Sequence, residues 1–380
     1  MDNNRRFLKK SLMLISIIWL ALIVRIPGLP FTSQDYNAFV SRWFETIKTG
    51  GGFSALKNAM GDYTQPYLYL LTLGTYTNIN TLFYVKMLSF IFEIMAATFI
   101  MKIVNMKYKN EKLGYLAFGL LLFIPTVIFN GSVWAQCDII FTSFVIGSIY
   151  YILIKKPITS LIFYGIALSF KLQAIFLLPL FGILLFKNRI KIYHFFIIPL
   201  AYLILSVPSL IVGRSLSDIL LTYVNQSGEY TNLTYNAPSI YQWLPSNLFS
   251  DTTMVGYIGI LLTLIVVIVI LYVSVRYTKV IKYENIIELA LLFTLIIPFL
   301  LPRMHERYFF MADVISLLYA FYCPKKFYVA IIIPLASLIC YFPFLYNTGT
   351  NYLFVPSIML FIVIVDLLYS FRLHLMIERN

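Results

Sequence analysis

Four charged or titratable side chains stand within five consecutive positions between two apolar runs: Arg303, His305, Glu306 and Arg307. The two arginines are four residues apart, so a helical segment would place them on one face. A guanidinium group offers several donors in one plane, and this geometry suits the oxygens of a phosphate. The segment therefore predicts an anion site in which Glu306 orients Arg307 or His305. The alternative is a surface ion pair that stabilises the fold only slightly.

Lys171 lies in the short polar segment 169–174, which also holds Gln173. About 30 residues separate the basic clusters on either side of this segment, and this length is too short for two ordinary membrane spans. We therefore expect the tip of the hairpin to lie within the membrane. A lysine at that depth is unfavourable unless it faces a wet cavity or an anion, so Lys171 is expected to join Arg303 and Arg307.

Two carboxylates stand in polar segments early in the chain. Asp35 belongs to "SQDYNAFVSRW" (33–43), and Asp62 belongs to "GDYTQP" (61–66). A carboxylate can act as the general base that accepts a proton from an attacking hydroxyl group. Each of the two is a candidate for that role, and an ordinary solvated side chain is the alternative.

Other polar residues allow two interpretations. The segment "NGSVWAQCD" (130–138) is either an edge of the same site or an interfacial tryptophan, Trp134, followed by a helix cap at Asp138. Lys86 and Glu93 are seven residues apart on one expected helix face, and a structural role is favoured for them. Asp366 lies within the last apolar run and has no assigned role.

The composition is that of a membrane protein. Hydrophobic residues make up 60% of the 380 residues and charged residues 12%, and the mean hydropathy is +0.84, far from the balance of a soluble protein. Helices satisfy their own backbone hydrogen bonds in a bilayer, so we expect one all-α polytopic membrane domain over residues 1–380. The net charge of +13 is attributed to basic loops beside anionic lipid, and nucleic acid is not an expected partner.

No cofactor is expected from the sequence. Three cysteines, Cys137, Cys323 and Cys340, are too few and too scattered for a disulfide framework or a thiolate metal site. The chain has neither a glycine-rich phosphate loop nor a paired set of histidines and carboxylates. A divalent metal is therefore allowed but not indicated.

Lysines and arginines form clusters that are expected to mark cytoplasmic loops. The clusters are Arg5/Arg6/Lys9/Lys10, Lys102/Lys107/Lys109/Lys112, Lys155/Lys156, Lys187/Arg189/Lys191, Arg276/Lys279/Lys282, Lys325/Lys326 and Arg372/Arg379. For all of them to share one side, the run 67–76 cannot cross; it is about half the length of a span and is expected to form an interfacial or re-entrant helix.

Twelve spans then remain. They lie near 11–28, 80–104, 113–129, 139–154, 158–170, 173–186, 192–212, 254–275, 285–302, 308–322, 327–345 and 352–371. The first is expected to be a retained span, because no small-residue cleavage site follows it. Both termini are then cytoplasmic, and the polar segments meet at the outer face. The first external loop, 29–79, is expected to hold the catalytic carboxylate, and the second, 213–253, to cover the site as a lid.

Five motifs in this order resemble the GT-C superfamily of membrane glycosyltransferases: "DYNAFVSRW", "DYTQPYLYLL", "VWAQCD", "KLQAIFLLPL" and "MHERYFF". Within that superfamily the sequence is most similar to the bacterial relatives of the PIG-V-type mannosyltransferases, which add the second mannose of the GPI anchor. The motifs span residues 35–310, and "MHERY" is the most specific of them. The resemblance implies a GT-C fold with about twelve transmembrane helices, in a bacterial plasma membrane.

The resemblance also implies an activity: the inverting transfer of a hexose from a polyprenyl-phosphate donor to a glycan, lipid or polymer acceptor at the outer face. The hexose that the family suggests is mannose. Its implied residues are Asp35 as base, Asp62 and Tyr63 on the acceptor side, Trp134, Gln136 and Asp138 beside the donor sugar, and Lys171, Gln173, His305 and Arg307 around the phosphate. Arg303 joins the phosphate group because of its spacing from Arg307, and Lys86, Glu93 and Glu306 are supporting residues.

The sequence departs from the family pattern at three places. Ala135 stands where the family usually has glycine, Leu172 where it has proline, and Thr64–Pro66 where it has paired prolines. These departures bear on the choice of sugar and acceptor, neither of which the sequence identifies.

Two other functions share these features. A flippase or transporter for lipid-linked sugars would also use twelve spans and a basic cavity. It should, however, bind near the midplane between repeat-related halves, and no repeat is evident. A polymerase or ligase that moves an oligosaccharide from a diphosphate lipid would share the basic site.

Overall fold

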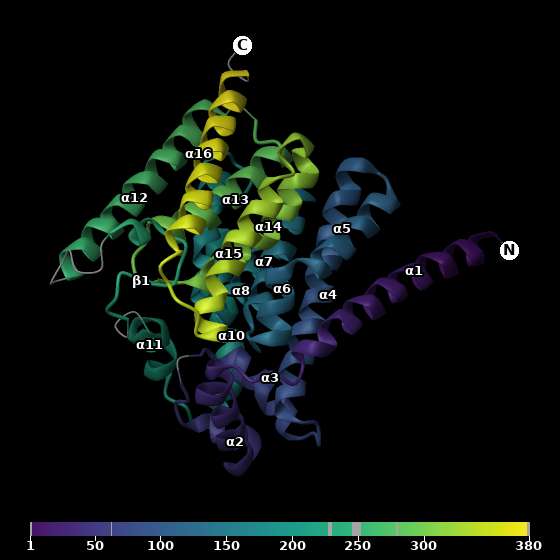
Figure 1. Ribbon diagram of the computed structural model, residues 1–380, viewed down its shortest axis with the longest axis vertical. Helices are drawn as coiled ribbons and strands as arrows, with labels where there is room; N and C mark the ends of the chain where they lie inside the picture. The colour runs from purple at the N-terminus through teal and green to yellow at the C-terminus, as the bar shows by residue number, and fades with distance from the viewer. Residues whose placement is uncertain (1, 62, 227–229, 245–251, 279, 378–380) are drawn as a thin grey trace.

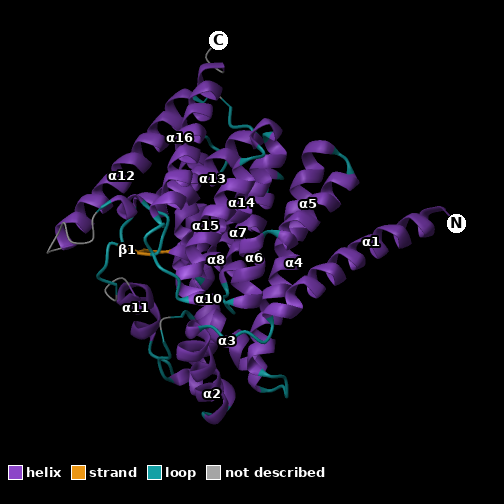
Figure 2. Cartoon of the chain, in the orientation of Figure 1, coloured by secondary structure: helices purple, strands orange, loops and turns teal. Residues whose placement is uncertain are grey.

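The computed structural model of the protein describes residues 2–61, 63–226, 230–244, 252–278 and 280–377. The described chain is a bundle of α-helices with one short pair of parallel strands, β1 (Thr234–Tyr235) and β2 (Met304–His305) (Figures 1 and 2). The expectation of an all-α membrane protein with several spans is confirmed. Three residues named above, Asp62, Lys279 and Arg379, lie outside the described ranges.

Seven helical segments in the described part of the chain are long and apolar enough to cross a membrane. They comprise α1 (Asp2–Arg25), α4 (Thr81–Tyr108), α10 (Ile197–Ile211) with the turn before it, α12 (Thr252–Tyr277), α13 (Tyr283–Leu300), α15 (Val329–Tyr346) and α16 (Phe354–Ile377). Each coincides with one of the twelve predicted spans.

The other five predicted spans are bent or short helices. The predicted span 113–129 corresponds to α5 (Glu111–Phe123) and α6 (Pro125–Ile128) with the turn after it, a pair bent by 53° at Ile124. Proline at the first position of α6 explains the bend, because its ring blocks a continuous helix. The remaining four are α7 (Asp138–Leu153), α8 (Pro157–Phe170), η5 (Leu172–Leu177) with α9 (Leu178–Phe186), and α14 (Phe310–Tyr322). They are shorter than the roughly 20 residues of an ordinary span.

The centre of the bundle is formed by α7, α13 and α14. Nearly every side chain of α13 and α14 is buried, and the two helices pack against each other and against α15 and α16. By contrast, α1 and α12 expose many large apolar side chains. In Figure 1 these two helices lie on opposite sides of the bundle. Exposed apolar faces of this kind suit contact with lipid.

Basic clusters that are distant in the sequence lie beside one another in pairs. Their side chains join Lys10 to Glu111, Lys107 to the carbonyl of Tyr322, Lys187 to that of Val275, Arg189 to that of Ile281, and Lys326 to Asp366. These contacts agree with the expectation that the clusters lie on one side of the membrane. The cytoplasmic identity of that side stays a prediction.

The predicted first external loop folds into short helices. These are η2 (Tyr36–Val40), α2 (Ser41–Thr49), η3 (Gly52–Lys57) and α3 (Gln65–Thr75), and they gather at the end of the bundle opposite the C-terminus (Figure 1). Helix α3 contains most of the run 67–76 and has only 11 residues, a length of about 16 Å. That is about half the thickness of a bilayer core.

One expectation about the segment 302–307 is wrong: it does not form a continuous helix. Helix α13 ends at Leu300, just before Pro302. Arg303 adopts a φ of +66° and donates its backbone N–H to the carbonyl of Leu233 at 2.7 Å. The chain then pairs as β2 with β1, and a 3₁₀ turn, η8 (Glu306–Phe309), follows. Arg303 and Arg307 therefore do not share a helix face, because pairing with the 213–253 segment extends the chain between them.

Candidate functional site

A cavity of about 560 Å³ lies among segments that are far apart in the sequence. Most of its lining side chains are apolar or aromatic. The polar ones coincide largely with the predicted site: Asp35, Gln136, Lys171, Gln173, Gln226, Arg303, His305, Glu306 and Arg307. Tyr63 also lines the cavity. Nine predicted residues from five separate polar segments therefore surround one cavity.

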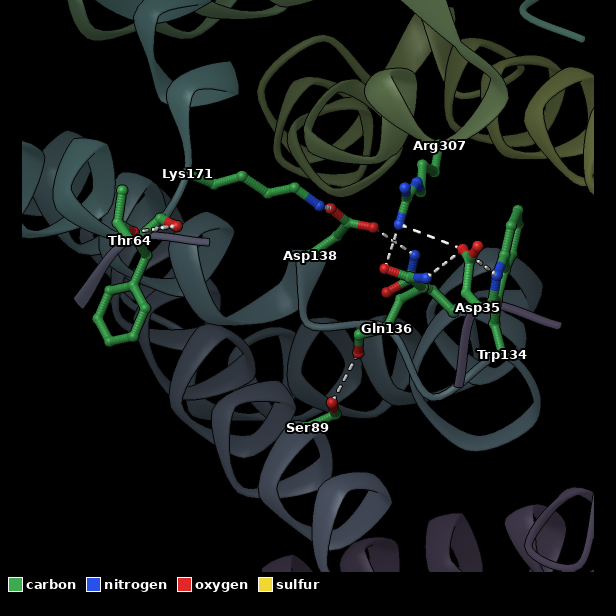
Figure 3. Close-up of polar contacts among 10 residues, drawn as sticks. Asp35, Thr64, Ser89, Trp134, Gln136, Asp138, Lys171 and Arg307 are labelled. Atoms are coloured by element: carbon green, nitrogen blue, oxygen red, sulfur yellow. Dashed lines mark hydrogen bonds and ion pairs between the residues drawn. The ribbon is translucent and has the colours of Figure 1, made fainter. Parts of the chain in front are cut away.

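Asp35 is the centre of a hydrogen-bonded group at the cavity wall (Figure 3). Its Oδ2 accepts hydrogen bonds from Nε1 of Trp134 at 3.0 Å and from Nε2 of Gln136 at 2.7 Å, and it lies 3.7 Å from Nη1 of Arg307. The amide oxygen of Gln136 accepts a hydrogen bond from the same Arg307 nitrogen. Oδ1 of Asp35 accepts no hydrogen bond from any of the described residues, so one carboxylate oxygen is available to a ligand.

The backbone before Asp35 is fixed by two side chains. The hydroxyl of Ser33 donates to the carbonyl of Trp134 at 2.7 Å and accepts from the backbone N–H of Tyr36 at 3.1 Å. Lys86 donates to three carbonyls of one turn, those of Gly28, Leu29 and Phe31, at 2.8, 3.1 and 2.6 Å. Lys86 therefore does not line the cavity but holds the loop that carries Asp35.

Glu93 lies on the same helix, α4, and has a different partner. Its Oε2 binds Nη2 of Arg25 at 2.5 Å, and both side chains are almost fully buried. Arg25 also donates to the carbonyls of Ala21 and Leu122. The pair joins α1 to α4 and α5 away from the cavity. The structural interpretation of Lys86 and Glu93 matches these contacts.

Trp134 is completely buried behind the cavity wall. Its ring stacks on Phe344 at a centroid distance of 4.9 Å and meets Tyr341 edge-on at 5.1 Å, while the Arg307 guanidinium lies 5.8 Å from the ring centre. The next residue, Ala135, has a φ of +63°. This is the left-handed region that favours glycine, so the backbone at Ala135 is strained by its side chain.

Asp138 and Lys171 form a second ion pair near the first group (Figure 3). The other Asp138 oxygen accepts from Nδ2 of Asn130 at 2.8 Å. Helix α7 begins at Asp138, but its N-cap is Cys137 and has no side-chain cap bond. The alternative of a helix cap at Asp138 is therefore wrong: its carboxylate is held by Lys171 and Asn130.

Lys171 owes its position to a break in the chain. It lies between α8 and η5 with φ −155° and ψ 135°, an extended conformation, and its side chain reaches Asp138 at the start of α7. Its Nζ also lies 5.7 Å from the centre of the Tyr63 ring. No other described residue accepts a hydrogen bond from this ammonium group, so it has protons left for a ligand.

His305 lines the cavity and sits among aromatic rings. It stacks on Tyr235 at 4.8 Å and contacts Tyr230 and Tyr308 at 4.5 and 5.2 Å. Burial, followed by the charges of Arg307 and Lys171, lowers the pKa of His305 to about 3. The imidazole is therefore neutral at physiological pH and can act only as a neutral hydrogen-bonding group.

Several buried polar atoms at the cavity have no hydrogen-bond partner among the described residues. They are Nε of Arg307, Nε2 of His305 and Oε1 of Gln173. Burial would lower the pKa of Arg307, but the charges of Asp35, Tyr63 and Asp138 raise it well above its usual value. Arg307 is thus a permanent cation with an unused N–H. Unsatisfied groups of this kind are rare in folded proteins and suit a site that a ligand completes.

The segment 213–253 reaches the cavity through its described residues. Tyr223, Gln226 and Tyr230 line the cavity, and β1 pairs with β2 immediately before Glu306. That this segment covers the site as a lid stays a prediction. The sequence singled out the segment 213–253 but none of these three residues. A chain with 29 tyrosines gives no reason to choose Tyr223 or Tyr230, and Gln226 belongs to no motif.

Other contributors were also missed. Trp43 lines the cavity and touches Phe39 and Tyr63 with ring distances of 5.8 and 5.2 Å. Asn130 holds Asp138, and Arg25 neutralises Glu93. Arg25 could have been found, because Arg25 and Glu93 are opposite charges in neighbouring apolar runs. Trp134 and Asp138 contact lining residues without lining the cavity themselves.

The described residues contain no group of three or more histidine, cysteine, aspartate or glutamate side chains that could hold a metal ion. Comparison with known proteins gives no assignment: no family model matches the sequence, and no curated protein matches it. The site must therefore be interpreted from its own chemistry. It combines one carboxylate with a free oxygen, two cations with unused donors, and apolar walls.

Proposed function

We propose that the protein is an inverting glycosyltransferase that moves a hexose from a polyprenyl-phosphate donor to a glycan, lipid or polymer acceptor. The observation that carries the proposal is the meeting of Asp35, Lys171 and Arg307 in one cavity with mostly apolar walls. A base for a hydroxyl group and cations for a departing phosphate are the two requirements of this reaction.

The walls of the cavity support a lipid donor. Ile260 of α12 lines the cavity, and much of the remaining surface of α12 is exposed and apolar. A phosphate bound by Lys171 and Arg307 therefore lies near a helix that suits contact with lipid. A donor with a phosphate head and an isoprenoid tail satisfies both features.

The reaction follows from the free oxygen of Asp35. Oδ1 accepts the proton of the acceptor hydroxyl as its oxygen attacks the anomeric carbon, and the bond from that carbon to the phosphate oxygen breaks. The phosphate leaves with the bonding electrons, and Arg307 and Lys171 stabilise its increasing negative charge. Gln136 bridges Asp35 and Arg307, which keeps the base and the cation at a fixed separation.

We extend the proposal to the architecture. It includes a GT-C fold with twelve spans, in which the short helices α7, α8, α9 and α14 cross a locally thin or tilted region, and a site that faces the outside of a bacterial plasma membrane. A cysteine placed at Lys109, with the partly exposed Cys323 replaced by serine, should resist an impermeant thiol reagent in intact cells. Labelling of that cysteine from outside would contradict this orientation.

The test of the function is incubation of the purified protein with a panel of polyprenyl-phosphate sugars and candidate acceptors. The expected result is consumption of one donor with release of polyprenyl phosphate. If no donor is consumed while a labelled lipid-linked sugar crosses proteoliposome membranes, the flippase is the correct function. Consumption of a diphosphate-linked oligosaccharide alone would indicate the polymerase or ligase.

A further inference from the structure

Glu306 is a carboxyl group in the cavity wall without a cationic partner. It is the first residue of η8, is only 2% exposed and lines the cavity next to His305 and Arg307. Within the described chain, no basic nitrogen lies within 4.0 Å of its carboxyl oxygens. Arg307 directs Nη1 toward Gln136 and Asp35 instead. An ionised carboxylate would be strongly disfavoured in such a place.

The groups around Glu306 are mostly acidic or neutral. Packed against η8 are α13, α14 and α15. Helix α15 contributes Cys340 and Tyr341, α14 contributes Asp313, and the end of α13, residues 296–300, has no titratable side chain. His305 is the residue before Glu306, Asp35 and Lys171 also line the cavity, and Asp138 is bound to Lys171.

Burial raises the pKa of Glu306 to about 8, and Asp35 and Asp138 act in the same direction while Arg307 opposes them. The carboxyl group is therefore protonated near neutral pH. A protonated carboxyl carries an O–H donor, whereas a carboxylate can only accept. This wall of the cavity thus holds a neutral donor beside the Arg307 cation.

We propose that Glu306 faces the donor phosphate as a neutral carboxylic acid and donates a hydrogen bond to one of its oxygens, next to Arg307. This inference rests on the proposed function and adds a third phosphate-binding group to it. No covalent bond of Glu306 changes, and its proton stays on the carboxyl oxygen. The hydrogen bond strengthens as the phosphate gains negative charge, so it lowers the barrier to departure of the sugar.

The proposal predicts a pH dependence with a definite sign. Below about pH 8 Glu306 is protonated and donates to the phosphate. Above that value it ionises, loses its donor and repels the phosphate. Turnover of the wild-type protein should therefore fall as pH rises through about 8, by up to about tenfold per pH unit.

Two variants separate the effect of the hydrogen-bond donor of Glu306 from the effect of its ionisation. Glu306→Gln keeps the shape and an N–H donor but does not ionise. Its turnover at neutral pH should be about threefold below wild type, with no fall between about pH 7 and 9. Glu306→Leu removes the donor and should lose roughly 10–100-fold. If Glu306→Gln declined with pH in parallel with the wild-type protein, or if wild-type turnover did not fall, the proposal would be overturned.

An infrared titration tests the inference without turnover. The difference between wild-type and Glu306→Gln spectra should contain the carbonyl stretch of a protonated carboxyl at pH 7, and this band should disappear above about pH 8. A short-chain polyprenyl phosphate should shift the band, because it accepts the hydrogen bond. Absence of the band, or a band that this ligand leaves unmoved, contradicts the inference. A wild-type protein that shows the shifted band but consumes no donor sugar contradicts the proposed function alone.

Discussion

Two lysine–aspartate pairs in this protein differ in how many of the lysine's N–H donors have an acceptor within the protein. Lys326 donates to both oxygens of Asp366 at 2.7 Å and to the hydroxyl of Ser370, while Tyr328 donates to Asp366 at 2.8 Å. Lys171, by contrast, has one acceptor, Oδ1 of Asp138. An ammonium group carries three protons. The hydrogen bonds of Lys326 are therefore satisfied within the protein, whereas Lys171 has unused donors.

The position of each pair agrees with this difference. Lys171 lines the cavity together with Asp35 and Arg307. Lys326 and Asp366 lie away from the cavity and join the turn before α15 to the middle of α16. What distinguishes the site residues from other charged pairs in this chain is therefore their unused hydrogen-bond donors and acceptors, and not their charge. Charge alone would have ranked the two pairs equally.

The largest expected effect is at Asp35. Asp35→Asn keeps the shape and the contacts to Oδ2 but removes the basic oxygen, so turnover should fall by about 10²–10⁴-fold while donor binding survives. The measurement is the initial rate with saturating donor and acceptor. Asp62→Asn is the control and should lose only modest activity.

The opposite pattern would move the base to Asp62. Retention of more than about a tenth of the wild-type rate in Asp35→Asn would remove Asp35 from the catalytic role. Either result would break the link between unused acceptor capacity and function.

The next effect concerns Arg307. Arg307→Ala removes a cation with an unused N–H, and kcat/KM for the donor should fall on the order of 10²–10³-fold. Arg307→Lys keeps the charge without the planar donors and should recover only part of the loss. Wild-type kcat/KM in Arg307→Ala, in a protein that elutes as a single folded species, would show that the phosphate does not bind there.

The two lysine–aspartate pairs can be compared directly with neutral double variants. Lys171→Met alone leaves Asp138 buried without its cation and should destabilise the protein strongly, by about 3–5 kcal/mol. Adding Asp138→Asn should restore stability but leave kcat/KM for the donor roughly 10–100-fold low.

The matched pair at the other end is Lys326→Met with Asp366→Asn. It should lower the free energy of unfolding by about 1 kcal/mol, because these groups are partly exposed, and keep wild-type turnover. Equal losses of turnover in the two double variants would break the comparison.

The smallest effect is at Ala135. Ala135→Gly relieves a left-handed alanine next to Trp134 and Gln136, and should raise the free energy of unfolding by about 0.5–1 kcal/mol. Ala201→Gly in the interior of helix α10 is the control and should lower it by about 1 kcal/mol. Unfolding midpoints in detergent measure both. Destabilisation of both variants alike would contradict the strain at Ala135.

The grouping of the site residues was predictable because polar residues in so apolar a chain must share the few wet surfaces. Asp35, Gln136, Lys171 and Arg307 come from separate motifs, and all four line one cavity. The long spans were predictable for the same reason, since about 20 apolar residues form a helix in lipid. Hydropathy could not reveal the bend before Pro125, although it gave the short helix α14 nearly its observed bounds.

Pairings across the fold were not predictable. The strand pairing of 304–305 with 234–235 depends on contacts between distant segments, and it overturned the helical interpretation of Arg303 and Arg307. The bond between Asp138 and Lys171 likewise appears only when α7 and α8 are packed together. Local sequence describes which residues are polar, but tertiary packing decides which partners they have.

The most direct test of the central claim is the anomeric configuration of the product. A donor of known configuration is supplied to the wild-type protein, and the new glycosidic bond is examined by NMR. If Asp35 acts as a base for direct displacement of the phosphate, the product has the inverted configuration. Retention of the donor configuration would mean that a residue of the protein forms a covalent intermediate, and it would contradict the role of Asp35 as the general base.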